Sequence, residues 1–532
     1  MKDKKKLKLK KFYFHPITSF ILLTALVILL SGLFSALELQ GTYTEIDSNG
    51  QLNSILVTVE NLLNYDGMKY MISNAARTFI SFAPLNMLLI SLLGISIAQS
   101  TGLLDTVMKR HINKLQPKTI TFLLLLLATV STLINEIGYV VLIPIAAIIY
   151  QASGRHPFAG ILTAFCGVAF GHGVTLFVGS LEVSLIPYTT IAARLIDEVF
   201  HVSLTSNLYI IIAMTFLISF IGTIILEKFI FPKLGRYKEK EVTELYQTEE
   251  LDIIDVEEEE QKKIAIDKKE KKGLRYAMIT GIIVVMLFIY MIIPNLPLSG
   301  MLLDMNETTY LNQLFGINSY FQDGFTYMMA LLFLIMGIAY GIGAKTIKND
   351  KDIINGATSY LNEVGGLIIM IFFASQFIAI FKKTNIGTII TAWGANLINN
   401  LSFSGLPLII LVIIVIAIAN LFITTPSLKW AILSSVVVPL LMQSNVSPQF
   451  AQFLLRVGDS MTNGITPLLA YFVIYIGYMN IYNPNKNRPI TISKGIKFVM
   501  PYCLMISACW IILTIGWYLL GLPLGPNVLP TI

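Results

Sequence analysis

Two charged side chains, Arg456 and Asp459, lie three residues apart in the stretch LLRVGDSMTNGITPLLAYF (454–472), whose neighbours are apolar enough for a lipid bilayer. A guanidinium binds carboxylates through two parallel hydrogen bonds, and a carboxylate can hold a cation or a proton. Side chains at i and i+3 on a helix can also neutralise each other, so a purely structural ion pair is the alternative. Gly464 and Pro467 interrupt the helix that carries both charges.

The composition of the chain indicates the environment of these charges. Of 532 residues, 55% are hydrophobic and 13% are charged, and the mean hydropathy is +0.71. Soluble domains carry roughly 25% charged residues. Apolar runs of about 20 residues, enough to cross a bilayer, recur along the chain, as at 17–37, 208–226 and 277–294. The sequence predicts an all-α polytopic membrane protein, and its net charge of +6 reflects basic cytoplasmic flanks rather than a nucleic-acid partner.

The distribution of lysine and arginine orients the predicted spans. The lysines of residues 1–16 hold the N-terminus in the cytoplasm, so the span at 17–37 exits and the acidic loop 38–76 lies outside. The interval 119–157 has basic residues at both ends and a polar middle, which predicts a re-entrant hairpin from the cytoplasmic side. A second re-entrant hairpin, 424–448, is expected to enter from outside.

The complete prediction is about nine transmembrane helices and two opposed re-entrant hairpins in the cytoplasmic membrane. The spans are expected at about 17–37, 79–98, 158–178, 207–228, 275–294, 326–344, 405–423, 450–480 and 499–521. Along the chain we expect a basic N-terminus (1–16), scaffold spans (17–118), the first hairpin and broken helix (119–206), a fourth span (207–232), a charged cytoplasmic loop (233–274), further scaffold spans with a membrane-associated segment (275–404), a seventh span with the second hairpin and broken helix (405–480) and the last span (481–532). Lys382 and Lys383 interrupt the apolar region 364–400, and the pattern leaves its course in the membrane open.

The two halves of the chain repeat each other. Pro448 follows Pro157 by 291 residues, and Gly464 follows Gly173 by the same interval. Because the charge pattern orients the first unit from inside and the second from outside, the repeat is inverted. Inverted repeats with interrupted helices that meet near the middle of the membrane are typical of secondary transporters. Charge at that depth is tolerated beside protein or a water-filled cavity, so we expect the Arg456 pair to face a shared wet pocket.

Several motifs together resemble the AbgT family, the p-aminobenzoyl-glutamate transporters. The motifs are GIAYGIGAKTIKNDKDII, FFASQFIAIF, SLKWAIL, RVGDSMTNGITPL, GYVVLIPIAA and GRHPFAGI. The resemblance runs from about residue 15 to 525. It implies a homodimer, nine spans and two hairpins per subunit, and a basin facing the cytoplasm. Members of the family are described both as importers of p-aminobenzoyl-glutamate and as efflux pumps for sulfonamide antimetabolites, driven by an ion gradient.

The resemblance implies a substrate site in the second half. p-Aminobenzoyl-glutamate has two carboxylates and an aromatic ring, and a guanidinium suits a carboxylate, so Arg456 is the expected anchor. Ser427 and Trp430 fall on the family's serine and tryptophan of the second hairpin, and Trp430 offers a stacking face. A tryptophan at the lipid interface is the alternative, because Lys429 beside it indicates an interfacial position.

The resemblance also implies an ion site and two hinges. Asn420 and Asp459 fall on the residues that hold sodium in the family, and their oxygen atoms suit an alkali cation. Asp459 as a proton carrier is the alternative. Pro448 and Pro467 fall on the hinge prolines.

This chain departs from the family pattern in its first half. It has Thr175 and Glu182 where the family commonly has asparagine and aspartate, and Asn135 followed by Glu136 where serine and aspartate are usual. We expect Asn135 and Glu182 to contact the substrate. The longer carboxylates reshape a coordination shell and leave the ion stoichiometry and the substrate range open, and the sequence does not choose between Na⁺ and H⁺ as the coupling ion. His172 is either a proton relay or a hydrogen-bonded wall of the cavity.

Other classes of function find little support in the sequence. We find no Ser-His-Asp arrangement, no metal-ligand spacing and no phosphate-binding glycine loop, so neither an enzyme nor a cofactor beyond the coupling ion is expected. A channel would not need two re-entrant hairpins that do not cross the membrane. The sequence predicts a membrane-embedded, ion-coupled transporter of a small anionic aromatic amide, with a sulfonamide exporter on the same fold as the alternative.

Overall fold

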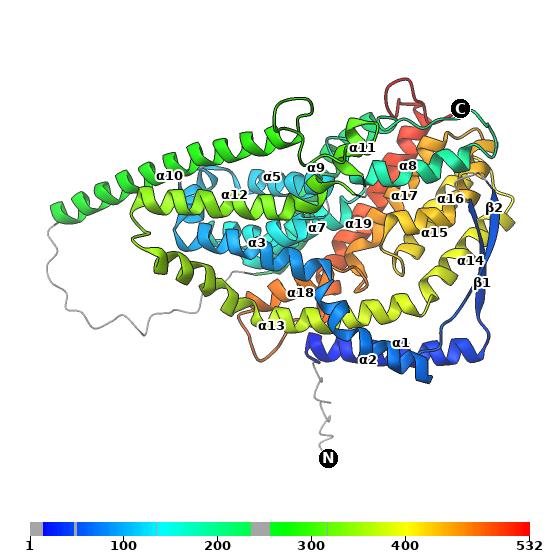
Figure 1. Cartoon of the computed structure of the whole chain (residues 1–532), viewed down its shortest axis with the longest axis horizontal. Coiled ribbons are helices and arrows are strands. Elements are labelled where there is room, and N and C mark those ends of the chain that lie inside the picture. The colour runs from blue at the N-terminus through cyan, green and yellow to red at the C-terminus, as the bar shows by residue number, and fades with distance from the viewer. Residues whose placement is uncertain (1–13, 47–50, 135, 236–255, 317) are drawn as a thin grey trace, which may run out of the picture.

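The computed structural model describes residues 14–46, 51–134, 136–235, 256–316 and 318–532. These residues form mainly helices, together with one two-stranded ribbon (Figure 1).

Along the described residues, the α-helices and strands follow one another in this order: α1 (Pro16–Ala36), β1 (Gln40–Ile46), β2 (Leu52–Thr58), α2 (Tyr65–Ile80), α3 (Ala83–Ser100), α4 (Leu103–Arg110), α5 (Pro117–Val130), α6 (Gly138–Ala152), α7 (Pro157–Phe170), α8 (Ser180–Ala193), α9 (Leu208–Ile225), α10 (Val256–Ile292), α11 (Tyr310–Phe315), α12 (Tyr320–Ala344), α13 (Asp350–Lys383), α14 (Ile386–Asn400), α15 (Leu406–Asn420), α16 (Pro426–Gln443), α17 (Pro448–Thr462), α18 (Phe472–Ile481) and α19 (Ile492–Leu519).

Helix length separates two classes of apolar helix. Within the described residues, eight helical segments are long and apolar enough to cross a membrane: Pro16–Ala36, Tyr65–Ser100, Leu208–Lys233, Ile266–Ile292, Tyr320–Ala344, Asp350–Lys383, Pro426–Gln443 and Ile492–Leu519. Five shorter apolar helices are Pro117–Leu133, Gly138–Ala152, Pro157–Phe170, Leu406–Asn420 and Phe472–Ile481. A 15-residue helix is about 22 Å long, less than the roughly 30 Å of a bilayer core. The helical, multi-pass class is confirmed, with eight helices of spanning length where we expected nine.

The long helices α3, α10 and α12 pack together at one end of the molecule (Figure 1). Small residues let them approach closely: a Cβ atom at Gly94 of α3 would lie 2.3 Å from the carbonyl oxygen of Ala330 on α12. Membrane helices associate through such close backbone contacts, because lipid offers no hydrophobic drive between them.

A methyl group at Gly94 tests this packing. We expect Gly94→Ala to lower the melting temperature in detergent, because overpacking costs about 1–3 kcal/mol. Gly324→Ala on α12 is the control, since a Cβ atom there meets nothing within 4 Å. Alanine favours a helix over glycine by about 1 kcal/mol, so the control should melt at the same or a higher temperature. Equal melting temperatures would contradict the assigned contact.

The region 364–400, whose course the sequence left open, divides at Asn385. The 34-residue helix α13 ends at Lys383, and α14 begins at Ile386. Lys382 and Lys383 lie in the last turn of α13, where positive charge complements the helix dipole. Asn385 has a φ of 61°, a left-handed conformation that asparagine tolerates better than most residues. The two lysines therefore mark the end of a long helix.

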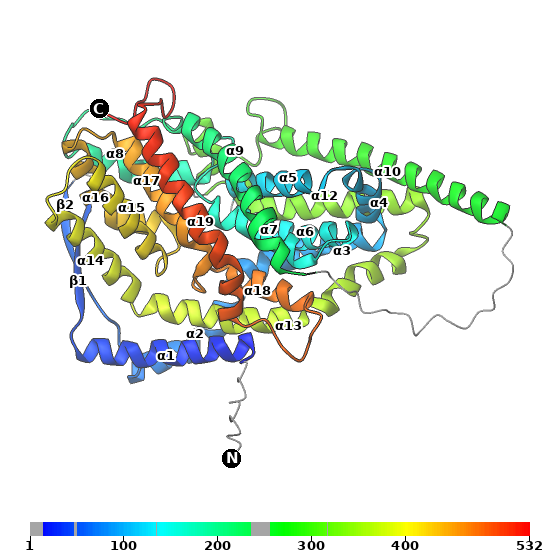
Figure 2. The ribbon, with the colours of Figure 1, turned by 180° about the vertical axis from the view of Figure 1, so that it is seen from behind.

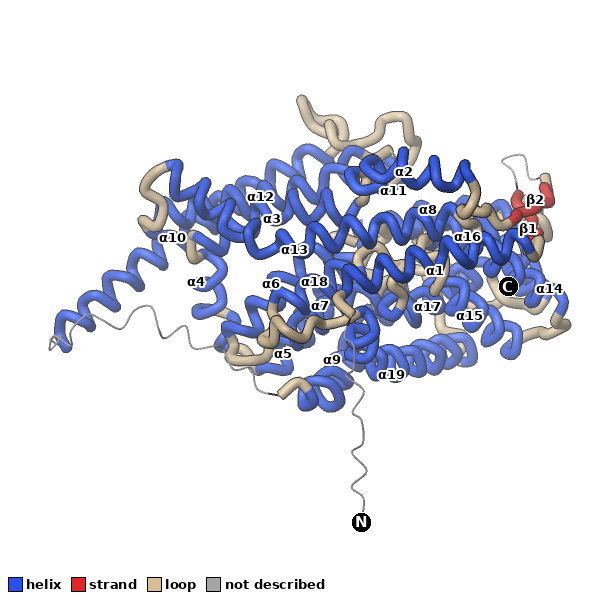
Figure 3. Tube along the Cα trace, turned by 90° about the horizontal axis from the view of Figure 1, so that it is seen from below, coloured by secondary structure: helices blue, strands red, loops and turns tan. Residues whose placement is uncertain are grey.

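The predicted outer loop 38–76 contains the β1–β2 ribbon, which the sequence analysis missed. It lies at the opposite end of the molecule from α10 (Figure 3). The unpaired edge of β1 is covered by side chains: Trp393 and Asn396 of α14 donate to its carbonyls at 2.9 and 3.1 Å, and Ser435 of α16 donates at 2.6 Å. An edge strand covered in this way cannot pair with another chain.

The two repeated units share one order of helices: α5 to α9 in the first unit and α15 to α19 in the second. In each unit the third helix, α7 or α17, ends before an irregular segment. The last helices, α9 and α19, lie side by side (Figure 2) and run antiparallel, because the amide of Tyr209 at the start of α9 donates to the carbonyl of Leu524 beyond the end of α19. This agrees with opposed orientations of the two units.

The second unit corrects one prediction. The interval 424–448, expected as a hairpin, contains a single helix, α16, followed by a turn. The interval 405–423, expected as a separate span, contains the 15-residue α15, which is the partner of α16. The reason lies in where the chain breaks: Pro426 starts α16 and disfavours a helical residue before it, whereas Pro439 lies inside α16 without ending it.

Candidate functional site

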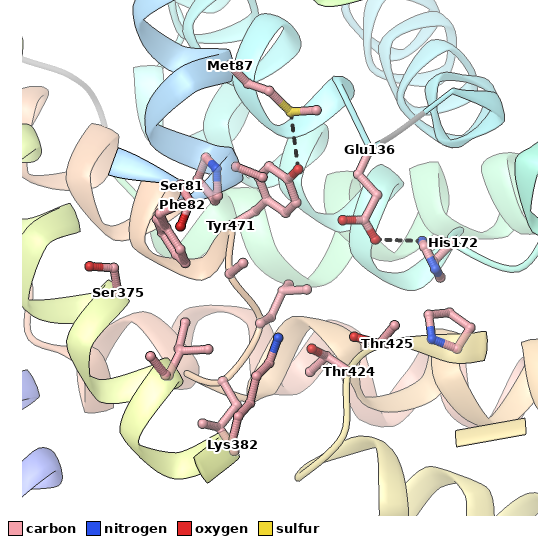
Figure 4. Close-up of a pocket in the computed structure, with 18 of the residues that line it drawn as sticks. Ser81, Phe82, Met87, Glu136, His172, Ser375, Lys382, Thr424, Thr425 and Tyr471 are labelled. Atoms are coloured by element: carbon pink, nitrogen blue, oxygen red, sulfur yellow. Dashed lines mark hydrogen bonds and ion pairs between the residues drawn. The ribbon is translucent and has the colours of Figure 1, made fainter. Parts of the chain in front are cut away.

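An open pocket of about 760 Å³ lies where the two repeated units meet the scaffold helices (Figure 4). Ligand pockets for small molecules have volumes of roughly 300–1,000 Å³. Its polar and aromatic lining includes Thr132, Glu136 and His172 from the first unit, Thr424, Thr425 and Tyr471 from the second, and Ser81, Phe82, Ser375 and Lys382 from the scaffold. In secondary transporters built from inverted repeats, the substrate site lies at the interface between the repeats.

Lys382 is the only lysine or arginine among the described residues that line this pocket. Its side chain points into the pocket and has no hydrogen bond or ion pair with another described residue (Figure 4). The neighbouring Lys383 points elsewhere, and its ammonium pairs with Glu60 at 2.7 Å. The pocket therefore offers one uncommitted positive charge to an anion.

Glu136 and His172 lie together in the pocket wall. The imidazole Nδ1 of His172 lies 3.5 Å from the Glu136 carboxylate (Figure 4). Glu136 has a φ of 55°, a left-handed conformation that is unusual for glutamate. Strained backbone of this kind is concentrated at binding sites, where the surrounding structure holds it in place.

Aromatic rings form another part of the wall. Tyr471 stacks on Tyr139 with ring centroids 4.9 Å apart, and its hydroxyl donates to the sulfur of Met87 at 3.2 Å. Phe82 also lines the pocket. These rings present an apolar surface, beside the Lys382 charge, on which an aromatic ligand can pack.

The irregular segments after α7 and α17 meet behind the pocket. The amide of Gly173 donates to the Ser460 hydroxyl at 2.9 Å, and a Cβ atom at Gly464 would lie 2.4 Å from the Phe170 ring. The Thr466 hydroxyl donates to the carbonyl of Leu421 at 2.8 Å. The amide and the carbonyl of Gly173, in the segment after α7, thus find partners within the protein in Ser460 and Arg456, as backbone groups must at membrane depth.

Arg456 does not face a water-filled pocket in this structure, contrary to the expectation from the sequence. Arg456 is 2% exposed, and its guanidinium contacts Glu182 at 2.6 Å and the carbonyl of Gly173 at 3.2 Å. The self-neutralised pair of Arg456 with Asp459 is also wrong, because each residue has a different partner. In this conformation the guanidinium is committed to the Glu182 carboxylate, and it lies behind the pocket wall near His172.

Asp459 is paired with Lys429, which is fully buried. The Lys429 ammonium also donates to Asn420 Oδ1 at 2.6 Å and to the carbonyl of Ile423 at 3.1 Å. The amide nitrogen of Asn420 donates to Thr462 Oγ1 at 3.0 Å, which directs its oxygen towards the lysine. We call Glu182, Lys429, Arg456 and Asp459 the buried charge layer.

The contacts of Lys429 also decide whether a sodium ion fits between Asn420 and Asp459. The side-chain oxygens that would bind the ion accept from the ammonium instead. Two positive charges 4 Å apart repel by about 4 kcal/mol at an effective dielectric constant of about 20. The residues present therefore do not fit a sodium ion in this arrangement.

Trp430 belongs to the core rather than to the pocket or the lipid interface. It is fully buried, and its indole nitrogen donates to Thr189 Oγ1 at 2.8 Å. The Thr189 hydroxyl in turn donates to Gln452 Oε1 at 2.7 Å. Ser427 is half-buried and follows Pro426, which lines the pocket.

The remaining predicted residues divide between the breaks and the undescribed part of the chain. Asn135 lies outside the described residues. Pro448 is buried at the start of α17, and Pro467 lies in the irregular segment between α17 and α18. Both occupy positions where the chain changes direction.

Two lysines of the site were missed by the sequence analysis. Lys382 was treated as an interruption of an apolar region, and Lys429 as a sign of the lipid interface. The available signal was their charge, because an ionisable residue inside an apolar membrane segment is by default a candidate functional residue.

Comparisons with known proteins agree along the whole chain. The family model described as "AbgT putative transporter family" matches residues 10–532. The p-aminobenzoyl-glutamate transport protein of Escherichia coli K12 is 27% identical over 517 residues, which cover 97% of this chain and 94% of that protein.

Two solved structures are also similar. The YdaH transporter of Alcanivorax borkumensis is 29% identical with a TM-score of 0.47, over 96% of this chain and 100% of that one. MtrF of Neisseria gonorrhoeae, reported to illuminate a class of antimetabolite efflux pumps, is 31% identical with a TM-score of 0.47, over 97% and 98%. The match of the family model over almost the full length is decisive: this chain belongs to the AbgT family of transporters.

Proposed function

We propose that this protein is a secondary transporter that moves p-aminobenzoyl-glutamate, or a similar anionic aromatic amide, across the cytoplasmic membrane. The observation that carries the proposal is the open pocket between the two repeated units, in which the free Lys382 ammonium lies with aromatic walls. The relative from E. coli, named as a p-aminobenzoyl-glutamate transport protein, supports the choice of substrate. An ion gradient drives the movement.

The contacts support a two-stage path for the anion. A carboxylate entering the pocket meets the uncommitted Lys382 ammonium first, while its ring packs near Phe82 and Tyr471. Arg456 is the second positive charge on the path, and a substrate carboxylate reaches it only in exchange for Glu182. This exchange couples substrate arrival to a rearrangement between α17 and α8, which carry the two partners.

Uptake of radiolabelled p-aminobenzoyl-glutamate into proteoliposomes tests the proposal, with Na⁺ and pH gradients imposed separately. We expect Lys382→Ala to raise KM by about tenfold or more, because a hydrogen bond to a charged group contributes about 1.5–3 kcal/mol. Lys383→Ala is the matched control, since its charge pairs with Glu60 outside this pocket. The control should leave KM unchanged.

Three results would count against the proposal. Uptake at the same rate with and without either gradient would exclude coupling to an ion gradient. Equal KM values for the two lysine variants would remove Lys382 from the binding path. Expulsion of preloaded sulfonamide by vesicles that do not take up p-aminobenzoyl-glutamate would favour an exporter on the same fold.

A further inference from the structure

We infer that the Lys429 ammonium is a built-in cation that replaces sodium between Asn420 and Asp459, so that this site does not bind sodium. The inference deepens the proposed function, because it concerns which ion can drive the transporter. It rests on the contacts of one side chain in the described part of the chain.

The position of the ammonium matches that of a coordinated cation. Lys429 extends from α16, and its nitrogen reaches two oxygens at the C-terminal end of α15, Asn420 Oδ1 and the Ile423 carbonyl, at 2.6 and 3.1 Å. The third partner is the Asp459 carboxylate on α17. The C-terminal end of a helix carries partial negative charge, and transporters use such ends to coordinate cations.

The ammonium also uses its full bonding capacity in this site. It has three N–H donors, and three oxygen-bearing groups contact it. Lys429 and Asp459 are 0% and 1% exposed, so water does not separate the two charges. A sodium ion at the same point would have to displace the lysine and leave a second positive charge buried beside it.

The surrounding amide is arranged for this cation. Asn420 Nδ2 lies 2.9 to 3.1 Å from Thr462 Oγ1, Asn463 Oδ1 and the carbonyl of Asp459, so its two N–H groups share these three acceptors. These contacts fix the amide so that its oxygen faces Lys429. One lysine therefore links α15, α16 and α17 of the second unit through groups that would otherwise need an external ion.

Sodium binding to the purified full-length chain in detergent tests the inference without any substrate. We expect no saturable ²²Na⁺ binding by the wild type, and the same melting temperature in NaCl as in choline chloride. Lys429→Ala should bind ²²Na⁺ saturably and melt at a higher temperature in NaCl, because a bound ion stabilises the folded state. Lys383→Ala, which removes a surface lysine, should behave as the wild type.

Two results would overturn the inference. One is saturable ²²Na⁺ binding by the wild type that is lost in Asp459→Asn. The other is a folded Lys429→Ala variant that neither binds ²²Na⁺ saturably nor melts at a higher temperature in NaCl. If Lys429→Ala folds only when it is solubilised in NaCl, this dependence on sodium supports the inference. If the variant folds in neither salt, the measurement of ²²Na⁺ binding to the wild type alone tests the inference. Because no transport is measured, failure of the proposed substrate leaves these results unaffected.

Discussion

Replacing Arg456 alone is expected to destabilise the protein strongly. Arg456→Met leaves the Glu182 carboxylate buried without its partner, and such a loss costs about 3–5 kcal/mol. The double variant Arg456→Met with Glu182→Leu removes both charges, and it should recover most of the free energy of unfolding. The measurement is denaturant-induced unfolding in mixed micelles, with melting temperature as a second observable.

Transport by the same two variants separates a structural role from a role in binding. The double variant should fold yet fail to take up p-aminobenzoyl-glutamate, because the second positive charge of the substrate path is gone. Normal uptake by the folded double variant would show that Arg456 serves stability alone. A stable Arg456→Met single variant would contradict the buried ion pair itself.

Truncation of Trp430 is expected to have a similarly large effect on stability and little direct effect on binding. Trp430→Ala removes a fully buried indole, and tryptophan-to-alanine changes in cores cost about 3–5 kcal/mol. Trp430→Phe keeps most of the volume and loses the hydrogen bond to Thr189, so we expect a loss of about 1–2 kcal/mol. The free energy of unfolding of the three proteins provides the comparison.

Substrate affinity of Trp430→Phe distinguishes the two assignments of this residue. Because the indole does not line the pocket, KM should match that of the wild type. Thr189→Val is the control, since it removes the same hydrogen bond from the other side together with the one from Thr189 to Gln452. A large rise in KM for Trp430→Phe with unchanged stability would restore the stacking role implied by the family resemblance.

The fold was accessible from the sequence wherever local chemistry decides it. Long apolar runs predicted the membrane helices, and Gly464 with Pro467 predicted the break after α17, because a missing N–H and a missing side chain act on their own neighbours. The break between α15 and α16 was predicted close to its place, at about 423–424, but the interval after it was wrongly expected to fold back as a hairpin, whereas α16 continues through Pro439 as one helix. The β1–β2 ribbon was missed because the interval 38–76 was read as an outer loop, and the helices that cover its edge come from distant parts of the chain.

The partners of the charged residues were not accessible, because they depend on tertiary contacts. Arg456 and Glu182 are 274 positions apart, and both were assigned to the substrate rather than to each other. Asp459 has an arginine three positions before it, yet it pairs with Lys429 on another helix. A sequence gives the charges that a membrane protein must compensate, whereas the packing of the two repeats decides which of them meet.

The formal charges of the buried charge layer sum to zero, and this has an electrical consequence. Moving one net elementary charge through the membrane potential involves about 2.3 kcal/mol per 100 mV. Glu182 and Asp459 cancel Arg456 and Lys429, so a movement of the layer as a whole does no such work. Current recorded during turnover should therefore report the cargo and its accompanying ion, while this layer adds no voltage dependence to the return of the empty carrier.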